Sequence, residues 1–160
     1  MSSPKIAIIT GAGTGIGKAT AQALLGAGYR VTLAGRRAEP LHAVVAELAA
    51  KADEALVVPT DVADPVSVKA MFAATVQKWG RVDVLFNNAG VGSGGLVWEN
   101  TVADWQWVLG VNVWGVVHGV RLFTPMMLEA AKKDPSYEGH IVNTASMAGL
   151  LTAPNMGVYN

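Results

Sequence analysis

The strongest constraint on the fold is a glycine-rich stretch near the amino terminus. Residues 6–10 form an apolar run as long as a buried strand, and four glycines then alternate with small residues from Gly11 to Gly17. Glycine permits a positive φ and lets the backbone approach a ligand without a Cβ in the way. A helix that begins near Gly15 would point its free N–H groups and positive dipole end into this turn, which suits a phosphate. The stretch therefore predicts a dinucleotide-binding turn; a tight strand-to-helix turn without a ligand is the alternative.

The spacing of these glycines differs from the commonest dinucleotide template. It reads Thr-Gly-x-x-x-Gly-x-Gly, and Ile16 stands where the last glycine of G-x-G-x-x-G would be. The turn alone therefore does not define a ligand, and the other segments have to be considered with it.

Composition sets the broad class of protein. The 160 residues suffice for one domain with a core, since 51% are hydrophobic and 15% are charged. A formal net charge of +0 gives no support to a nucleic-acid or membrane-surface role. There is no cysteine, and the three histidines lack metal-ligand spacing, so we expect no disulfide and no metal site. No apolar run approaches the ~18 residues of a membrane span, and no leader-like segment comes before the first strand. We therefore expect a cytoplasmic protein.

Short apolar runs alternate with longer helical patterns. The predicted strands are Lys5–Thr10, Arg30–Ala34, Ala55–Thr60, Val82–Asn87 and His140–Ala145. The predicted helices start at about Gly15 and end at Gly26–Gly28, cover Pro40–Ala52, run from Asp64-Pro65 to about Trp79, and run from Thr101 to about Lys133 with a kink at Pro125. In the first helix, the expected buried face comprises Ile16, Thr20, Ala23, Leu24 and Ala27.

This alternation predicts an α/β fold with three layers. Strands without polar alternation are typical of a parallel sheet covered by helices on both faces, and the connections are expected to be right-handed. We therefore predict a doubly wound parallel sheet (Rossmann fold), as one dinucleotide-binding domain over residues 1–160.

Two segments that follow predicted strands indicate how a dinucleotide would bind. About twenty residues after the glycines, an acidic residue normally holds the ribose 2′-OH of NAD. Gly35 takes that position here and Arg36 follows it, so a 2′-phosphate would meet a guanidinium instead of a carboxylate. This favours NADP, with NAD possible; a solvated turn at Arg36 and Arg37 is the alternative. Asp61 could accept a hydrogen bond from the adenine amino group or start the next helix.

Four motifs, in order, resemble the short-chain dehydrogenase/reductase family. They are Thr10-Gly11-x-x-x-Gly15-x-Gly17, Asn87-Asn88-Ala89-Gly90, Asn112, and Ser146 followed by Tyr159. The resemblance extends from Lys5 to the last residue. With the segments above, it implies that the cofactor-binding residues are Gly11, Gly13, Thr14, Gly15, Ile16, Gly17, Arg36, Asp61, Val62, Asn88, Ala89 and Gly90.

The resemblance also implies the reaction, a hydride transfer between a nicotinamide and the carbon of an alcohol or ketone. In such a site Ser146 donates a hydrogen bond to the substrate oxygen, Tyr159 transfers a proton, and Asn112 holds a water that links a lysine to solvent. An ordinary phenol titrates near about 10, and a neighbouring ammonium lowers that pKa. The structural alternatives are a strand end at Ser146, a helix residue bonded to backbone at Asn112 and a half-buried aromatic ring at Tyr159.

The residues that flank the expected site are mostly apolar, which favours a hydrophobic alcohol or ketone substrate. They are Val91, Leu96, Val97, Trp98, Met147, Leu150, Leu151 and Met156. The family implies a homodimer or homotetramer. The other functions considered are an epimerase or dehydratase of the extended relatives, which Thr10–Gly17 argues against, a non-catalytic dinucleotide-binding protein, and an inactive fragment.

The family's lysine lies four residues after its tyrosine, whereas this sequence ends one residue after Tyr159. We therefore expect an amino-terminal portion of a longer family member, a fold incomplete at its C-terminus, and negligible turnover by these 160 residues even if they bind dinucleotide. Assays with NAD(H) or NADP(H) and a panel of alcohols and ketones test this expectation. Turnover above background by a chain of verified mass would contradict it.

Overall fold

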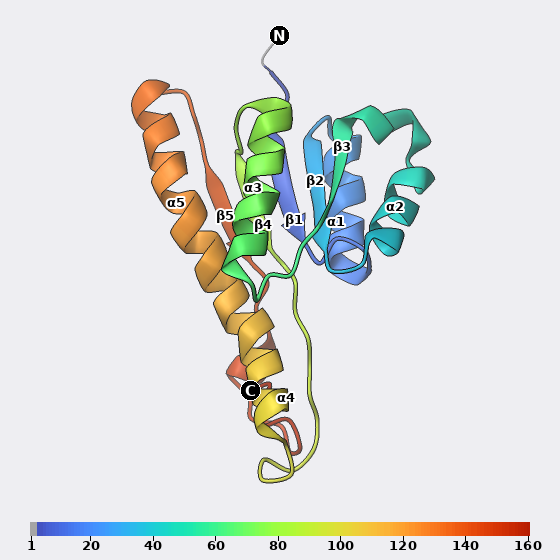
Figure 1. Ribbon diagram of the computed structural model, residues 1–160, viewed down its shortest axis with the longest axis vertical. Helices are drawn as coiled ribbons and strands as arrows, with labels where there is room; N and C mark the ends of the chain where they lie inside the picture. Colours follow the sequence, from blue (N-terminus) through green and yellow to red (C-terminus); the bar gives the residue numbers. More distant parts are fainter. Residues whose placement is uncertain (1–2) are drawn as a thin grey trace.

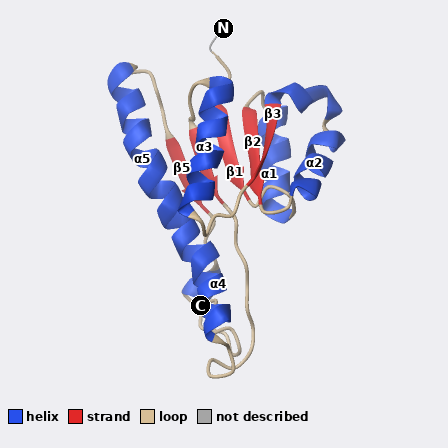
Figure 2. Ribbon diagram, in the orientation of Figure 1, coloured by secondary structure: helices blue, strands red, loops and turns tan. Residues whose placement is uncertain are grey.

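The computed structural model describes residues 3–160, and its centre is a five-stranded parallel sheet in the order β3-β2-β1-β4-β5 (Figures 1 and 2). The strands are β1 (Ile6–Thr10), β2 (Arg30–Gly35), β3 (Ala55–Pro59), β4 (Val84–Asn87) and β5 (His140–Asn143). The helices are α1 (Gly15–Gly26), α2 (Ala38–Glu47), α3 (Pro65–Trp79), α4 (Val102–Leu109) and α5 (Gly115–Lys133). All five predicted strands and the three-layer fold are confirmed.

Helices pack against both faces of the sheet around β1, because successive side chains of a strand point to opposite sides, whereas β5 at the edge is largely exposed. On one face, buried residues of β1 and β2 pack against α1 and α2: Ala7, Ile9, Val31, Leu33, Leu25, Leu41 and Val44. On the other face, buried residues of β1 and β4 pack against α3 and α5: Ile8, Leu85, Val68, Met71, Phe123 and Met127. Every residue of β1 is buried, which explains its uninterrupted apolar sequence.

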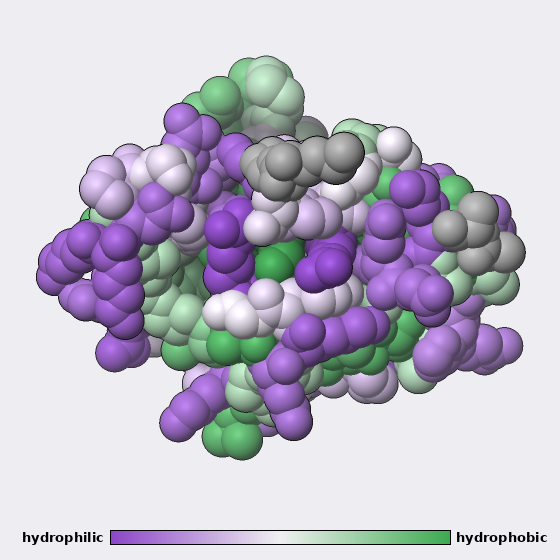
Figure 3. Space-filling model, turned by 90° about the horizontal axis from the view of Figure 1, so that it is seen from above, coloured by the Kyte–Doolittle hydropathy of each residue, from purple (hydrophilic) through white to green (hydrophobic). Residues whose placement is uncertain are grey.

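The topology places a crevice beside β1. From β1 the chain builds outward through β2 and β3, and then crosses back to add β4 and β5 on the other side. In such a sheet the connections after β1 and β4 diverge at the carboxyl ends of the strands, and ligands bind there. The opposite end, where the strands begin, carries many hydrophilic side chains (Figure 3).

The second predicted helix is wrong in extent. Helix α2 ends at Glu47, and a 3₁₀ segment follows over Ala49–Glu54. Leu48 lies between them with φ −116° and ψ 43°. Its partly buried side chain packs against the core formed by β1, β2, α1 and α2. The contact of Leu48 with the core therefore ends the helix, although the alanine-rich sequence itself favours continuation.

The long fourth helix is interrupted, and not at the predicted place. A π-helical turn over Gly110–Trp114 separates α4 from α5, whereas α5 continues as one helix through Pro125. Close packing marks the interruption, because a Cβ on Gly115 would lie only 2.8 Å from Val62 Cγ2. Single π turns inside helices are often associated with functional sites.

The buried face of α1 is also not the predicted one. Gly17, Ala21 and Leu25 are buried, while Ile16 is 63% exposed. The two end signals are confirmed: the Asp64 side chain accepts from two amides at the start of α3, and Thr101 and Asp104 form a capping box at α4. Hydrogen bonds from Thr101 hold the pKa of Asp104 below its ordinary value.

A buried carboxylate joins the starts of β1 and β4. Asp83 is 2% exposed, and its Oδ2 accepts from the Ile6 amide at 2.7 Å and from Arg81 Nε at 3.1 Å. Nearby, Tyr137 donates its hydroxyl to the carbonyl of Val82. Burial, and then the charge of Asp83, raise the pKa of Tyr137. These groups lie at the end of the sheet away from the crevice, so they stabilise the fold.

Replacing Gly17 by alanine is expected to destabilise the protein by about 2 kcal/mol or more. A Cβ at this position would overlap the carbonyl oxygen of Gly11 and lie 2.6 Å from Asn88 Nδ2. Denaturant unfolding measures the change in free energy. Gly26→Ala is the matched control: that position in α1 is open, so alanine should stabilise by about 0.4–1 kcal/mol. A Gly17→Ala protein as stable as the parent would contradict this packing.

Candidate functional site

Three adjoining cavities form one groove along the carboxyl ends of the strands. The β2-side cavity lies between the glycine-rich turn and the ends of β2 and β3. The central cavity lies over the glycine-rich turn, and the β5-side cavity lies between the ends of β4 and β5. The central cavity shares lining residues with both neighbours: Gly11, Thr14 and Val91 with the β2-side cavity, Asn88, Thr144 and Tyr159 with the β5-side cavity, and Ala89 and Gly90 with both.

The glycine-rich turn lines the central cavity with Gly11, Thr14, Gly15 and Ile16. Gly11 and Gly15 have φ of +66° and +52°, a conformation that favours glycine. Thr14 is the N-cap of α1 in extended conformation, yet its side chain caps no amide, and the first turn contains no acidic residue. The first N–H groups of a helix have no partner within it, so this helix start can accept an anion.

Thr10 fixes the position of the turn that follows β4. Its Oγ1 accepts from the amides of Asn88 at 2.9 Å and Ala89 at 3.0 Å. In return, Asn88 Nδ2 donates to the carbonyl of Thr10 at 3.0 Å, and Asn88 Oδ1 accepts from the Thr144 hydroxyl at 3.1 Å. Thus Asn88 links the carboxyl ends of β1, β4 and β5.

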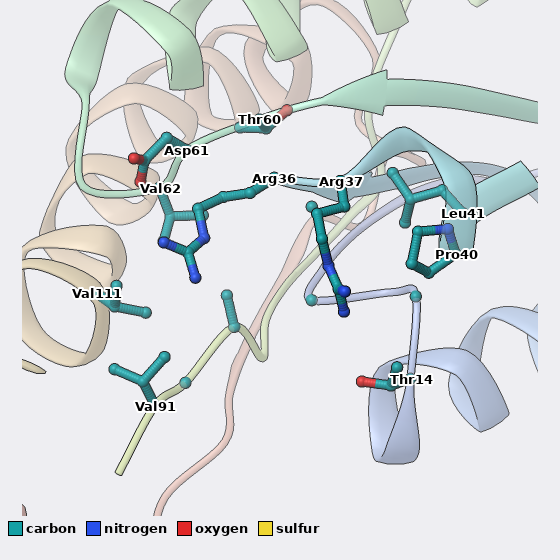
Figure 4. A pocket seen from close by; sticks show the side chains of 15 residues that line it. Thr14, Arg36, Arg37, Pro40, Leu41, Thr60, Asp61, Val62, Val91 and Val111 are labelled. Carbon is teal, nitrogen blue, oxygen red and sulfur yellow. The ribbon is translucent and has the colours of Figure 1, made fainter. Parts of the chain in front are cut away.

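Two arginines line the β2-side cavity at the end of β2. In Figure 4 the Arg36 side chain runs toward Asp61 and Val62, whereas Arg37 points toward the glycine-rich turn. Both are exposed, and neither forms an ion pair within residues 3–160. Asp61 lies in the same cavity, but its Oδ1 accepts from the amide of Ala63 at 3.0 Å. That bond closes a turn before the N-cap of α3, which is Asp64, so Asp61 does not have the helix-start role considered from the sequence.

The β5-side cavity brings together the three predicted catalytic residues, Asn112, Ser146 and Tyr159. Ser146 is exposed, and its Oγ accepts from the amide of Ala148 at 3.1 Å. A hydroxyl that accepts one bond keeps its own hydrogen for donation. Tyr159 is half-buried and also lines the central cavity. An oxygen atom of a bound ligand could therefore meet two hydroxyl donors in this cavity.

The side chain of Asn112 is bonded to backbone. Its Oδ1 accepts from the amide of Val91 at 2.9 Å, and its Nδ2 donates to the carbonyl of Val91 at 2.8 Å. This is the alternative that the sequence left open for this residue. Asn112 thereby ties the π turn between α4 and α5 to the loop after β4; a water held by it remains a prediction.

Most predicted cofactor residues line the groove, but Gly17 does not. Gly17 is buried beneath the turn and lets α1 approach Asn88. Several other lining residues were not predicted from the sequence: Pro40, Leu41, Thr60, Val111 and Thr144. Thr144 directly follows β5, which ends at Asn143, whereas the predicted strand His140–Ala145 included it, so the end of this strand was placed too late for Thr144 to be recognised.

The apolar residues predicted around the site are largely exposed rather than part of the core. Val97, Trp98, Met147, Leu150 and Leu151 are each at least half exposed. They lie on the loop after β4 and on the segment after Ser146. Within the described range 3–160, no cluster of potential metal ligands is found, and no helix is both long and apolar enough to cross a membrane.

Fold and groove together define a doubly wound domain with the geometry of a dinucleotide-binding protein. The profile of the short chain dehydrogenase family matches residues 5–160. The chain therefore belongs to the short-chain dehydrogenase family.

Individual relatives agree with this assignment. Meso-2,3-butanediol dehydrogenase of Serratia marcescens is 40% identical over 91% of this chain and 55% of that protein. A short chain dehydrogenase/reductase from Burkholderia phymatum, solved in complex with NAD, is 46% identical with a TM-score of 0.92, over 98% of this chain and 54% of that one. An alcohol dehydrogenase from Thermococcus sibiricus, complexed with 5-hydroxy-NADP, is 30% identical with a TM-score of 0.86, over 98% and 64%. The chain spans about three fifths of the length of the curated relatives that it matches; the share is 60% for one of them and 61% for another.

Replacing Thr10 by valine is expected to lower the free energy of unfolding by about 2 kcal/mol or more. Valine has the same shape but leaves the amides of Asn88 and Ala89 without their acceptor. Thr10→Ser keeps the hydroxyl and loses one methyl, so it should cost only about 1 kcal/mol. Denaturant unfolding of both variants gives the comparison. A loss in Thr10→Val no larger than that in Thr10→Ser would show that the hydroxyl is not the main contribution of this residue.

Proposed function

We propose that the protein is an NAD(P)-dependent oxidoreductase that transfers a hydride between a nicotinamide and the carbon of an alcohol or ketone. One observation carries the proposal: a continuous groove joins an anion-accepting glycine-rich turn to a cavity lined by Ser146 and Tyr159. Membership of the short-chain dehydrogenase family supports it. The single domain over residues 1–160 supplies the dinucleotide-binding part.

The residues of the groove fit a dinucleotide. The pyrophosphate would lie against the turn from Gly11 to Gly17, where N–H groups are free of side-chain caps and no acidic residue repels an anion. The adenosine would lie in the β2-side cavity with Asp61 and Val62, and the nicotinamide end beside Ala89 and Gly90. When bound, the nicotinamide would supply or accept the hydride.

We propose NADP as the preferred dinucleotide, with NAD as the second candidate. Arg36 and Arg37 both line the β2-side cavity, and guanidinium groups bind phosphate in bidentate geometry. Arg37 joins Arg36 as a candidate because its side chain points back toward the glycine-rich turn (Figure 4). The complex of the Burkholderia phymatum relative contains NAD, which keeps the second candidate open.

The chain's own residues perform the proton chemistry. Ser146 would donate its free hydroxyl hydrogen to the substrate oxygen, while the amide of Ala148 fixes the direction of that hydroxyl. The Tyr159 phenol would give a proton to the oxygen in reduction and take it back in oxidation. Asn112 would hold the start of the loop after β4 in place beside these two groups, through its paired bonds to Val91.

We further propose a hydrophobic alcohol or ketone as substrate and a cytoplasmic homodimer or homotetramer as the working form. Exposed apolar side chains around the β5-side cavity support the substrate class. For the assembly, large apolar side chains are exposed on α4, the π turn and α5, namely Val102, Trp107, Val113, Trp114 and Leu128. A small-molecule substrate, rather than a nucleic acid, is consistent with the formal net charge of +0.

Charge reversal of both arginines, Arg36→Glu with Arg37→Glu, is expected to weaken NADPH binding at least about tenfold more than NADH binding, because only NADPH carries the 2′-phosphate. Fluorescence titration of the reduced dinucleotides gives both dissociation constants. Arg121→Glu, on an exposed position of α5 outside the groove, is the control for a change of net charge. Equal losses for the two dinucleotides would overturn the NADP assignment. Failure of the parent protein to bind either one would overturn the proposed function.

A further inference from the structure

Two segments far apart in the sequence meet beside the β5-side cavity. The first is the bracing loop, residues 91–100 after β4, and the second is the Tyr159 segment, residues 155–160 (both descend from the sheet in Figure 1). The amide of Gly95 donates to the carbonyl of Asn155 at 2.9 Å, and Gly95 pairs with Met156 in a parallel bridge. The bracing loop is thus hydrogen-bonded to the segment that carries Tyr159.

A side-chain contact next to this bridge leaves no room for a larger residue. A Cβ built on Gly157 would overlap Cγ2 of Val97, whereas Val97 Cβ would lie 3.5 Å away, at ordinary van der Waals distance. One methyl group of Val97 therefore occupies the space that a side chain at position 157 would need. Val97 is 50% exposed, so only part of its surface is in contact with the protein.

The bracing loop is itself held at both ends, although it contains three glycines. At its start, the backbone of Val91 is bonded twice by the Asn112 side chain. At its end, Asn100 accepts from the Ser93 hydroxyl and donates to the carbonyl of Leu96, both at 2.9 Å. Because the loop is held at both ends, a displacement of α4 or α5 would also displace the segment that the loop contacts.

What it contacts is the backbone turn that places the tyrosine. The amides of Tyr159 and Asn160 both donate to the carbonyl of Met156, the residue paired with Gly95. Asn155, at the start of this turn, has φ +62°, the left-handed conformation that asparagine adopts more readily than most residues with a side chain. The Tyr159 ring also approaches the loop directly, because its Cδ2 lies 4.0 Å from the Cβ position of Gly92.

We infer that Val97 is a positioning residue that acts through Gly157 to fix the Tyr159 phenol against the substrate oxygen. The inference rests on the proposed function, since it assigns a purpose to the position of Tyr159. It also explains why a valine at position 97 faces a glycine at position 157: the methyl group that fills the space between the two segments comes from the bracing loop. The double variant Val97→Ala with Gly157→Ala, in which a Cβ on residue 157 takes the place of the Val97 methyl group, should therefore restore the junction.

The test compares Val97→Ala, Gly157→Ala and the double variant with the parent. Hydrogen exchange reads the junction at the Gly95 and Tyr159 amides. Gly157→Ala should speed exchange at both amides at least about tenfold, because the added Cβ separates the segments. The double variant should return both amides to near the parent rate, since its two Cβ atoms meet at 3.5 Å. Val66→Ala, at a position on α3 that is 73% exposed, is the matched control.

The second measurement is turnover, made on the longer family member expected from the sequence, because the 160 residues themselves are expected to turn over negligibly. Gly157→Ala should lower kcat by about tenfold or more while the KM for dinucleotide stays within about twofold, because a small displacement of a reacting group is costly, whereas a Cβ at position 157 meets none of the residues proposed to hold the adenosine and the pyrophosphate. The double variant should recover kcat. Unchanged exchange in Gly157→Ala, or failure of Val97→Ala to rescue it, would overturn the positioning role. A parent protein that binds no dinucleotide would instead overturn the proposed function, and the exchange result would still decide whether the junction exists.

Discussion

The groove depends on how closely the first βα turn approaches the turn after β4. A single hydroxyl, Thr10 Oγ1, accepts two amides of the second turn, and Asn88 returns a bond to the Thr10 carbonyl. Such an approach is possible only because Gly17 has no Cβ to meet the Gly11 carbonyl and Asn88. The glycine that the sequence suggested as a ligand contact is therefore a packing residue. Its absent side chain allows the other glycines to face the central cavity.

The hydrogen bonds of the groove distinguish the residues that support its backbone from the residues that are available for chemistry. Buried or irregular backbone must find polar partners, and here side chains supply them. Thr10, Asn88 and Asn112 use their polar atoms on the backbone of the segments that form the groove. Ser146 and Tyr159 differ, since Ser146 retains a free donor and Tyr159 lines two cavities. The site therefore consists of a few available groups on a framework of fully engaged ones.

Features that depend on local sequence could be predicted, and those that depend on distant contacts could not. Buried parallel strands appear as apolar runs, helix starts at Asp64 and Thr101 carry their own capping chemistry, and residues after parallel strands converge on the groove. The end of α2 depends on how Leu48 packs against the core, and the π turn accompanies close packing on Val62. The junction of Val97 with Gly157 joins segments sixty residues apart, with α4, the π turn, α5, β5 and a short 3₁₀ turn between them, and it leaves no pattern in the sequence of either segment.

The net charge of the chain also differs from the local charge of the β2-side cavity. The formal net charge is +0, and several cations are paired, as Lys18 is with Glu47 and Arg81 with Asp83. Arg36 and Arg37 are adjacent and line one cavity, and within residues 3–160 no carboxylate forms an ion pair with either. A neutral chain has little general attraction for polyanions, but it can hold one anion where two guanidinium groups lack internal partners. Neutral composition and a local phosphate site are thus compatible, because the first concerns the sum of charges and the second their pairing.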